Sequence, residues 1–467
     1  MLYNDFPLRI IYLYAYGKKN SKLSYFDSLF SGIKWTSISS VVVSLLAILK
    51  IAVLTSFLAK SDFGHFALVM SILSFINLFS DFGLPIAILH IKTITPKAFS
   101  SLYWLGILSG LLIYLILYWL TPYIADYFQA PLLEQLLPIA GLAVLINSIG
   151  NLYRVLALKK LKYSRIAGIN ILESIVVFTS ACLLAMAGWG VWSLIHAYLL
   201  GKVILELFFF VYGYRQLPLS FVFSRQAMNP FFKIGKYSVG GQLINYFNRE
   251  IDILLIARLG GDAATLGVYS LARQLVLKVG GLVNNVISEA ARPILPKFQD
   301  KLEKLKINFL KIIQTISTLN SLLYILFIIF TPQIVAVLYG EDYNNLIPVA
   351  RILAIFAYLR SIIRYNGNLI VATGKTELSL FMNAFTLPLI ASAVWIGFSG
   401  GLSGIAWGQV VAMTLLLFIS WYFLIYRLLR VYLSTYLFAL LPSWALIREV
   451  LTRIMKKYEK KVDQPDR

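Results

Sequence analysis

Runs of about 20 apolar residues recur along the whole chain, and they limit its possible folds more than any other feature. Each run is long enough to cross the hydrocarbon core of a bilayer as one α-helix. The runs are too long and too continuous for the alternating strands of a membrane β-barrel. Because 59% of the 467 residues are hydrophobic and 13% are charged, we predict an all-α polytopic membrane protein rather than several soluble domains.

The apolar runs predict twelve spans, with ends set to within about four residues. They lie near 35–59, 65–89, 101–121, 135–153, 166–187, 190–212, 235–257, 266–289, 308–330, 346–371, 377–398 and 402–426. The spans divide the chain into an N-terminal extension (1–30), a first six-helix lobe (31–213), a linker (214–230), a second six-helix lobe (231–430) and a tail (431–467). Tyr432–Ile447 is interpreted as an interfacial or re-entrant segment, followed by a basic helix that lies on anionic lipid.

The net charge of +21 would indicate a nucleic-acid partner in a soluble protein. In a membrane protein it follows instead from the excess of Lys and Arg in cytoplasmic connections. Most of these residues lie in the N-terminal tail and in 91–100, 154–165, 215–236, 292–311, 360–375 and 427–467. The intervening connections 122–134, 188–189, 331–345 and 399–401 contain none. This alternation predicts that both termini lie in the cytoplasm.

Short motifs recur about 200 residues apart. Gly32-Ile33-Lys34-Trp35 opens the first span and Gly235-Lys236-Tyr237-Ser238 opens the seventh. Beyond the ends of these spans, Phe63-Gly64-His65-Phe66 corresponds to Leu266-Gly267-Val268-Tyr269. The pattern predicts a duplicated six-helix unit. Since each half has an even number of spans, the halves are expected to be related by an axis along the membrane normal.

Charged residues inside the predicted spans indicate function. Six cations fall there, namely Lys50, Lys202, Arg249, Arg273, Lys278 and Arg351. At roughly 2.5–3.5 kcal/mol each at mid-bilayer, they would cost on the order of 15–20 kcal/mol if they faced lipid. That exceeds the stability of a typical domain, roughly 5–15 kcal/mol. They must therefore form ion pairs, extend to the membrane surface or face a hydrated cavity.

The seventh span carries the clearest polar pattern. Its polar residues recur at spacings of three and four, so they share one helical face: Ser238, Gly241, Gln242, Asn245, Asn248, Arg249 and Asp252. The eighth span adds Arg273 and Lys278, and the fifth adds Glu173. We interpret these residues as lining a water-filled cavity rather than a sealed polar network. Because bases are in surplus, an anionic passenger is expected, above all a phosphate or pyrophosphate.

The order and spacing of several motifs resemble those of bacterial polysaccharide exporters. The motifs are Gly32-Ile33-Lys34-Trp35, Lys60-Ser61-Asp62-Phe63-Gly64, Ser80-Asp81-Phe82-Gly83-Leu84, and Asn248 to Asp252 followed by Leu266-Gly267-Val268-Tyr269-Ser270. The chain is similar over about residues 30–430 to the O-antigen-type flippases of the multidrug/oligosaccharidyl-lipid/polysaccharide (MOP) exporter superfamily. Many members of that superfamily have fourteen spans, whereas twelve are predicted here.

The resemblance implies two lobes in a V and alternating access in the bacterial cytoplasmic (inner) membrane. The implied cargo is an undecaprenyl-pyrophosphate-linked oligosaccharide, and membrane lipids and polysaccharide-assembly proteins are the expected partners. Arg249, Arg273, Lys278 and Lys50 are expected to bind the pyrophosphate, Gln242, Asn245 and Asn248 the sugars, and Asp252 or Glu173 a coupling ion.

No cofactor and no catalysis are expected. The single cysteine, Cys182, and three scattered histidines do not make a metal site. Gly374-Lys375-Thr376 lacks the leading glycine of a phosphate-binding loop, because position 369 is Leu369, and is interpreted as a cytoplasmic turn. A polysaccharide polymerase or ligase is an alternative, but its usual large outer loop with Arg or His is missing. A drug exporter of the same superfamily is another, although its cavity would need acids for cationic drugs.

Overall fold

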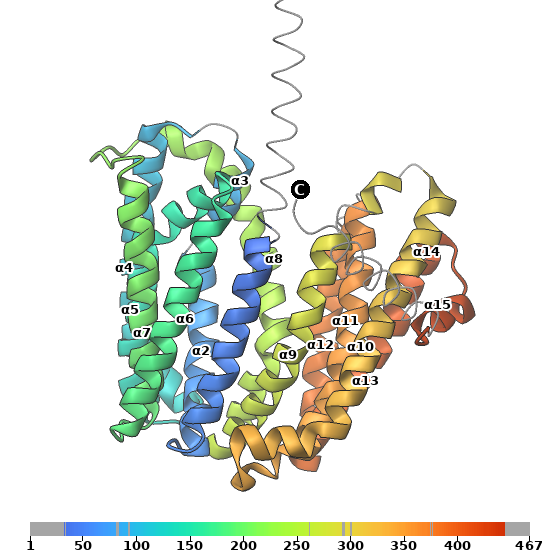
Figure 1. Cartoon of the computed structure of the whole chain (residues 1–467). Helices are drawn as coiled ribbons and strands as arrows, with labels where there is room; N and C mark the ends of the chain where they lie inside the picture. The colour runs from blue at the N-terminus through green and yellow to red at the C-terminus, as the bar shows by residue number, and fades with distance from the viewer. Residues whose placement is uncertain are drawn as a thin grey trace, which may run out of the picture.

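The structure is a computed structural model of the chain (Figure 1). It describes residues 32, 34–80, 84–91, 94–260, 262–291, 295–298, 301–373, 375 and 377–443. The predicted N-terminal extension at 1–30 and the basic tail after residue 443 lie outside the described residues.

Every regular element in the described ranges is helical. The first helix is Lys34–Leu54. It is followed by α2 (Lys60–Ser80), α3 (Leu84–His90), α4 (Pro96–Tyr127), α5 (Leu133–Lys159), α6 (Tyr163–Met186), α7 (Val191–Tyr214), α8 (Arg225–Arg258) and α9 (Ala263–Ala291). The second half contains α10 (Leu302–Tyr339), α11 (Leu346–Thr373), α12 (Glu377–Gly397), α13 (Gly401–Ser420), a π-helical turn at Trp421–Tyr426, α14 (Arg427–Leu429) and α15 (Leu433–Leu440).

The predicted all-α membrane fold is confirmed. Nine stretches of the described residues are long and apolar enough to cross a membrane, and the longest, Phe381–Leu429, includes most of α12 and all of α13. The predicted seventh and eighth spans, α8 and α9, are helices of 34 and 29 residues and are not among these nine stretches. The count of twelve spans therefore stays a prediction.

Several helices continue beyond the apolar run that predicted a span. α4 extends to Tyr127 and α10 to Tyr339, so much of the expected outer connections 122–134 and 331–345 is helical. In the same way α11 runs to Thr373 and includes part of the predicted basic connection at 360–375. Hydropathy reports where side chains become polar, whereas a helix ends where its backbone hydrogen bonding ends.

The hydrophobic core is continuous at one end of the molecule and divided at the other. One large cluster joins helices from both halves of the chain, with Leu137, Ile195, Tyr269 and Val335 among its fully buried members. Two smaller clusters are separate, one confined to α3–α8 and one to α10–α15 and their neighbours. Figure 1 shows the corresponding two bundles, with α8 and α9 between them. The bundles therefore share packed side chains at one end only.

At the shared end, α2 and α9 cross with their backbones in contact. A Cβ atom on Gly64 would collide with the carbonyl oxygen of Ala263, and one on Gly267 with the carbonyl oxygen of Lys60. Gly64 and Gly267 are equivalent positions of the sequence repeat. The repeat thus places one glycine from each half at the same crossing, and only residues without a side chain allow this approach.

Polar contacts between the two bundles gather near this crossing. Thr55 donates through Oγ1 to the carbonyl of Leu338 at 3.2 Å. Lys60 Nζ donates to the carbonyl of Asp342 at 2.6 Å. The Arg258 guanidinium lies 4.9 Å from the centre of the Tyr127 ring. These contacts close the shared end.

Replacing either crossing glycine by alanine is expected to destabilise the protein by about 1–3 kcal/mol, because backbone cannot move aside as a flexible side chain can. The measurement is the thermal unfolding midpoint of purified protein in detergent. Gly168→Ala is the matched control, since Gly168 is helical and a Cβ there would meet nothing within 4 Å. Equal midpoints for Gly64→Ala and Gly168→Ala would contradict the close crossing.

Candidate functional site

α8 is the most polar of the long helices, yet it lies inside the molecule. It packs against α2, α3 and α4 on one side and α12 on the other. Its apolar side chains contribute to the shared core, including Ile253 and Ile256, each at most 1% exposed. Nearer its N-terminus, the same helix carries the polar residues Asn245, Asn248 and Arg249, which line a cavity inside the molecule. This arrangement keeps charge away from lipid, where it would be costly.

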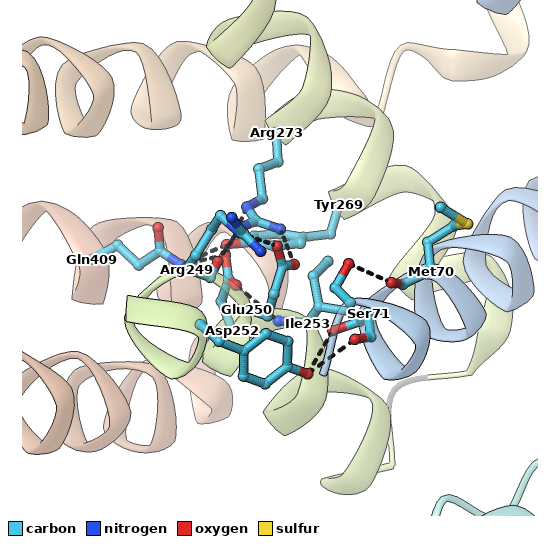
Figure 2. Close-up of polar contacts among 11 residues, drawn as sticks. Met70, Ser71, Arg249, Glu250, Asp252, Ile253, Tyr269, Arg273 and Gln409 are labelled. Atoms are coloured by element: carbon cyan, nitrogen blue, oxygen red, sulfur yellow. Dashed lines mark hydrogen bonds and ion pairs between the residues drawn. The ribbon is translucent and has the colours of Figure 1, made fainter. Parts of the chain in front are cut away.

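Two arginines and two carboxylates form an ion network between α8 and α9 (Figure 2). Arg273 of α9 places Nη1 3.2 Å from Glu250 Oε2 and Nε 3.1 Å from Asp252 Oδ2. It also donates through Nη2 to the carbonyl of Arg249. Arg249 itself donates through Nε to Glu250 Oε1 at 2.8 Å. The four charges of this network balance.

Asp252 is held by several donors besides Arg273. Tyr269 donates its hydroxyl to Asp252 Oδ2 at 2.9 Å, and Gln409 of α13 donates Nε2 to the same oxygen at 3.0 Å. The backbone N–H of Ile253 lies 2.9 Å from Oδ1. A buried carboxylate is tolerated when its oxygens accept such bonds. Asp252 therefore ties α8 to α9 and to α13.

The two arginines of the network differ in exposure. The Arg273 side chain is 11% exposed, while that of Arg249 is 53% exposed. The guanidinium of Arg273 is engaged by two carboxylates. Arg249 shares one carboxylate with Arg273, and its remaining N–H groups can bind another anion.

Arg249 lines two adjacent cavities. The larger, about 460 Å³, is bounded by α8, α11, α12 and α13, and its polar lining is Asn245, Asn248, Arg249, Arg360, Arg364, Asn383, Thr386 and Ser420. The smaller, about 340 Å³, lies between α8, α9, α10 and α11 and shares Arg249, Arg360 and Arg364 with the first. Among the described residues that line the larger cavity there are three arginines and no acid.

Sequence reasoning missed Arg360, Arg364 and Glu250. The two arginines were counted in the basic connection at 360–375, but α11 continues through them. Arg360 is half-buried and Arg364 exposed. Their spacing of four puts them on one helical face, and this signal could have identified them. Glu250 directly follows Arg249 and could have been included with its neighbours.

The predicted amides lie along the same helix. Asn245 is exposed, and Asn248 donates through Nδ2 to the carbonyl of Asn383 at 3.0 Å. Both line the larger cavity. Gln242 is half-buried one turn before Asn245. The structure thus brings together Asn245, Asn248 and Arg249, as expected.

The remaining predicted residues form a second polar group. Lys50, on the helix Lys34–Leu54, interacts electrostatically with Lys278 of α9 and with Glu173 of α6. Glu173 in turn interacts with Lys202 and Arg154. Lys50 and Lys278 come from opposite halves of the chain. This group contains more cations than acids, as the α8–α11 cavities do.

α8 is also anchored to the N-terminal bundle. Tyr246 donates its hydroxyl to the carbonyl of Ser71 on α2 at 3.0 Å, and its ring contacts Phe75 at 5.3 Å between centres. Through Tyr246 and Asp252, α8 links both bundles.

No group of three or more His, Cys, Asp or Glu side chains that could hold a metal ion occurs in the described part of the chain.

Comparison with known proteins identifies the family to which the chain belongs. A family model described as "Polysaccharide biosynthesis protein" matches residues 53–348, more than half of the chain. The chain belongs to this family.

Two curated relatives match along most of their length. Teichuronic acid biosynthesis protein TuaB of Bacillus subtilis (strain 168) is 27% identical over 412 residues, which cover 87% of this chain and 84% of TuaB. Lipopolysaccharide biosynthesis protein WzxC of Escherichia coli (strain K12) is 26% identical over 415 residues, which cover 89% of this chain and 84% of WzxC.

Solved structures confirm the fold of the MOP superfamily. An inward-facing multidrug resistance MATE transporter of that superfamily aligns with a TM-score of 0.66 at 16% identity, covering 84% of this chain and 98% of the transporter. Lipid II flippase MurJ in an inward closed conformation aligns with a TM-score of 0.63 at 13% identity, covering 95% and 94%. The family member described here therefore shares the multi-helix fold of these two proteins.

Arg273→Gln is expected to destabilise the protein by about 3–5 kcal/mol, because Glu250 and Asp252 would lose the buried cation between them. Arg249→Gln, at the exposed end of the same network, should cost about 1 kcal/mol or less. Thermal midpoints of the purified variants test this.

Combining Asp252→Asn with Arg273→Gln removes both partners and should recover part of the loss, as a double-mutant cycle would show. If Arg273→Gln and Arg249→Gln were equally stable, the network would not be the buried clamp described here.

Proposed function

We propose that the protein is a flippase that moves undecaprenyl-pyrophosphate-linked oligosaccharide repeat units across the bacterial cytoplasmic membrane. The observation that carries the proposal is the cavity at which Arg249, Arg360 and Arg364 meet without a lining acid. Family membership supports it, as do relatives named for teichuronic acid and lipopolysaccharide biosynthesis and a fold shared with a lipid II flippase.

Arginine suits this substrate. The planar guanidinium donates two parallel N–H bonds to phosphate oxygens and stays charged at any physiological pH. A hydrogen bond to a charged group contributes about 1.5–3 kcal/mol. Arg249, Arg360 and Arg364 would hold the pyrophosphate, and Asn245, Asn248 and Gln242 would contact sugar hydroxyls. Arg273 would act as a positioning residue, because it orients Glu250 and Asp252 beside Arg249.

The divided core supports an alternating-access cycle. With the predicted topology, the end at which the cores separate faces the cytoplasm, as do both termini, so the substrate would enter there. Release on the other side requires the shared end to open. The Thr55, Lys60 and Arg258 contacts that close it are each worth on the order of 1 kcal/mol, so substrate and ion binding can outweigh them.

The second polar group and the carboxylates extend the proposal. Lys50 and Lys278 would contact the substrate from opposite halves of the chain. Asp252 and Glu173 are the proposed ion-coupling residues. Protonation of Asp252 would weaken its bonds with Arg273, Tyr269 and Gln409, which join three helices, and so would couple an ion gradient to their packing. Other polysaccharide-assembly proteins would use the product at the outer surface.

Arg360→Gln and Arg364→Gln are each expected to lower substrate affinity by about 10- to 100-fold and to reduce surface polysaccharide while protein remains in the membrane. The readout is surface glycan in a strain lacking the native gene, with lipid-linked repeat units expected to accumulate on the cytoplasmic leaflet. This accumulation also separates a flippase from a polymerase, whose loss leaves single repeats outside.

Arg351→Gln is the matched control, because Arg351 is an exposed arginine on the same helix and contacts the carbonyl of Ile328. Normal glycan display in both cavity variants would overturn the proposal.

A further inference from the structure

A third cavity lies at the end of α13, apart from the residues described above. Its volume is about 800 Å³, and it is lined by Lys375, Glu377, Leu378, Tyr422, Phe423, Tyr426, Arg427, Leu428 and Arg430. It shares no lining residue with the two arginine cavities. The proposed transport function does not use it.

The charge of this cavity is predominantly positive. Lys375, from the turn between α11 and α12, lines the cavity together with Arg427 and Arg430, and Glu377 is the acid in the lining. The ion pairs found in the described residues involve none of these four. Lys375, Arg427 and Arg430 are all exposed. The cavity can therefore accept an anionic group.

Aromatic rings place the cavity at a membrane surface. Tyr422 and Tyr426 stack at 6.1 Å between ring centres. The Arg427 guanidinium lies 5.4 Å from the centre of the Tyr422 ring, and that of Arg430 lies 5.9 Å from Tyr426. The membrane-crossing stretch that contains α13 ends at Leu429. Tyrosine beside cationic side chains at the end of a span is typical of the headgroup level of a bilayer.

The backbone is also unusual here. A π-helical turn covers Trp421–Tyr426, and such turns are frequent at functional sites. Arg430 caps α14 with φ of 54°, in the left-handed region, and its N–H bonds to the carbonyl of Tyr426 at 2.9 Å. Glycine is the usual residue at such a cap because it carries no Cβ. An arginine at this position keeps a long cationic side chain at the cavity despite the strain.

We propose that this cavity binds the phosphate group of an anionic membrane lipid, with Lys375, Arg427 and Arg430 as the ligands of the phosphate. Its position at a span end fits a lipid headgroup, and its aromatic wall fits the glycerol and upper acyl region. The bound lipid would bridge the turn before α12 to the end of α13, two helices that also line the larger arginine cavity.

The test measures lipid binding to the purified full-length protein by native mass spectrometry, with phosphatidylglycerol, phosphatidylcholine and inorganic phosphate as separate probes. Phosphatidylglycerol should bind and phosphatidylcholine should not. Lys375→Gln combined with Arg430→Gly should weaken phosphatidylglycerol binding by about tenfold or more. Arg430→Gly relieves the left-handed strain, so the thermal midpoint of that variant should not fall, and misfolding is separated from lost binding.

The matched control is Lys301→Gln with Lys304→Gln, which removes two exposed cations at the start of α10 and leaves the cavity intact. Binding in this control should equal that of the unmodified protein. An equal loss in control and cavity variants, or equal binding of phosphatidylcholine, would overturn the proposal. The proposal would also be overturned if inorganic phosphate bound, its binding were weakened by the cavity variant, and phosphatidylglycerol did not bind. That result would indicate a site for free phosphate.

Discussion

The free-energy cost of placing charge in hydrocarbon determines where α8 and α9 can lie. Their charged residues would be expensive in contact with lipid, so both helices occupy the interior between two apolar bundles. Arg273, Glu250 and Asp252 neutralise one another there, and Tyr269 and Gln409 complete the hydrogen bonding of Asp252. This clamp lets a polar helix occupy the centre of the molecule, and it leaves Arg249 directed toward water.

The rest of the architecture follows from the way the two bundles meet. They share a core at the end where α2 and α9 cross at Gly64 and Gly267, and they have separate cores at the other end. The central helix α8 lines two cavities, of about 460 and 340 Å³. The two crossing glycines occupy corresponding positions in the short motifs that recur about 200 residues apart in the sequence.

Much of the fold was predictable because each apolar run extends over most of a helix. The polar face of α8 was also predictable, since Asn245, Asn248 and Arg249 do line one cavity. Two things were not. Pairing of Arg273 with Glu250 and Asp252 depends on how α9 packs on α8, which periodicity does not reveal. Arg360 and Arg364 were hidden because hydropathy cannot separate a connection from a helix whose polar face lines a cavity.

The measurement that tests the account most directly is the water accessibility of position 245 on α8. A single cysteine is introduced by Asn245→Cys in a Cys182→Ser background, and Leu207→Cys on the lipid-exposed side of α7 serves as the control. A membrane-impermeant maleimide should label position 245 from the side of the basic connections, should be blocked by a lipid-linked diphosphate, and should leave position 207 unlabelled. Absence of labelling at 245, or labelling that the diphosphate lipid does not affect, would contradict a wet, anion-binding cavity at Arg249.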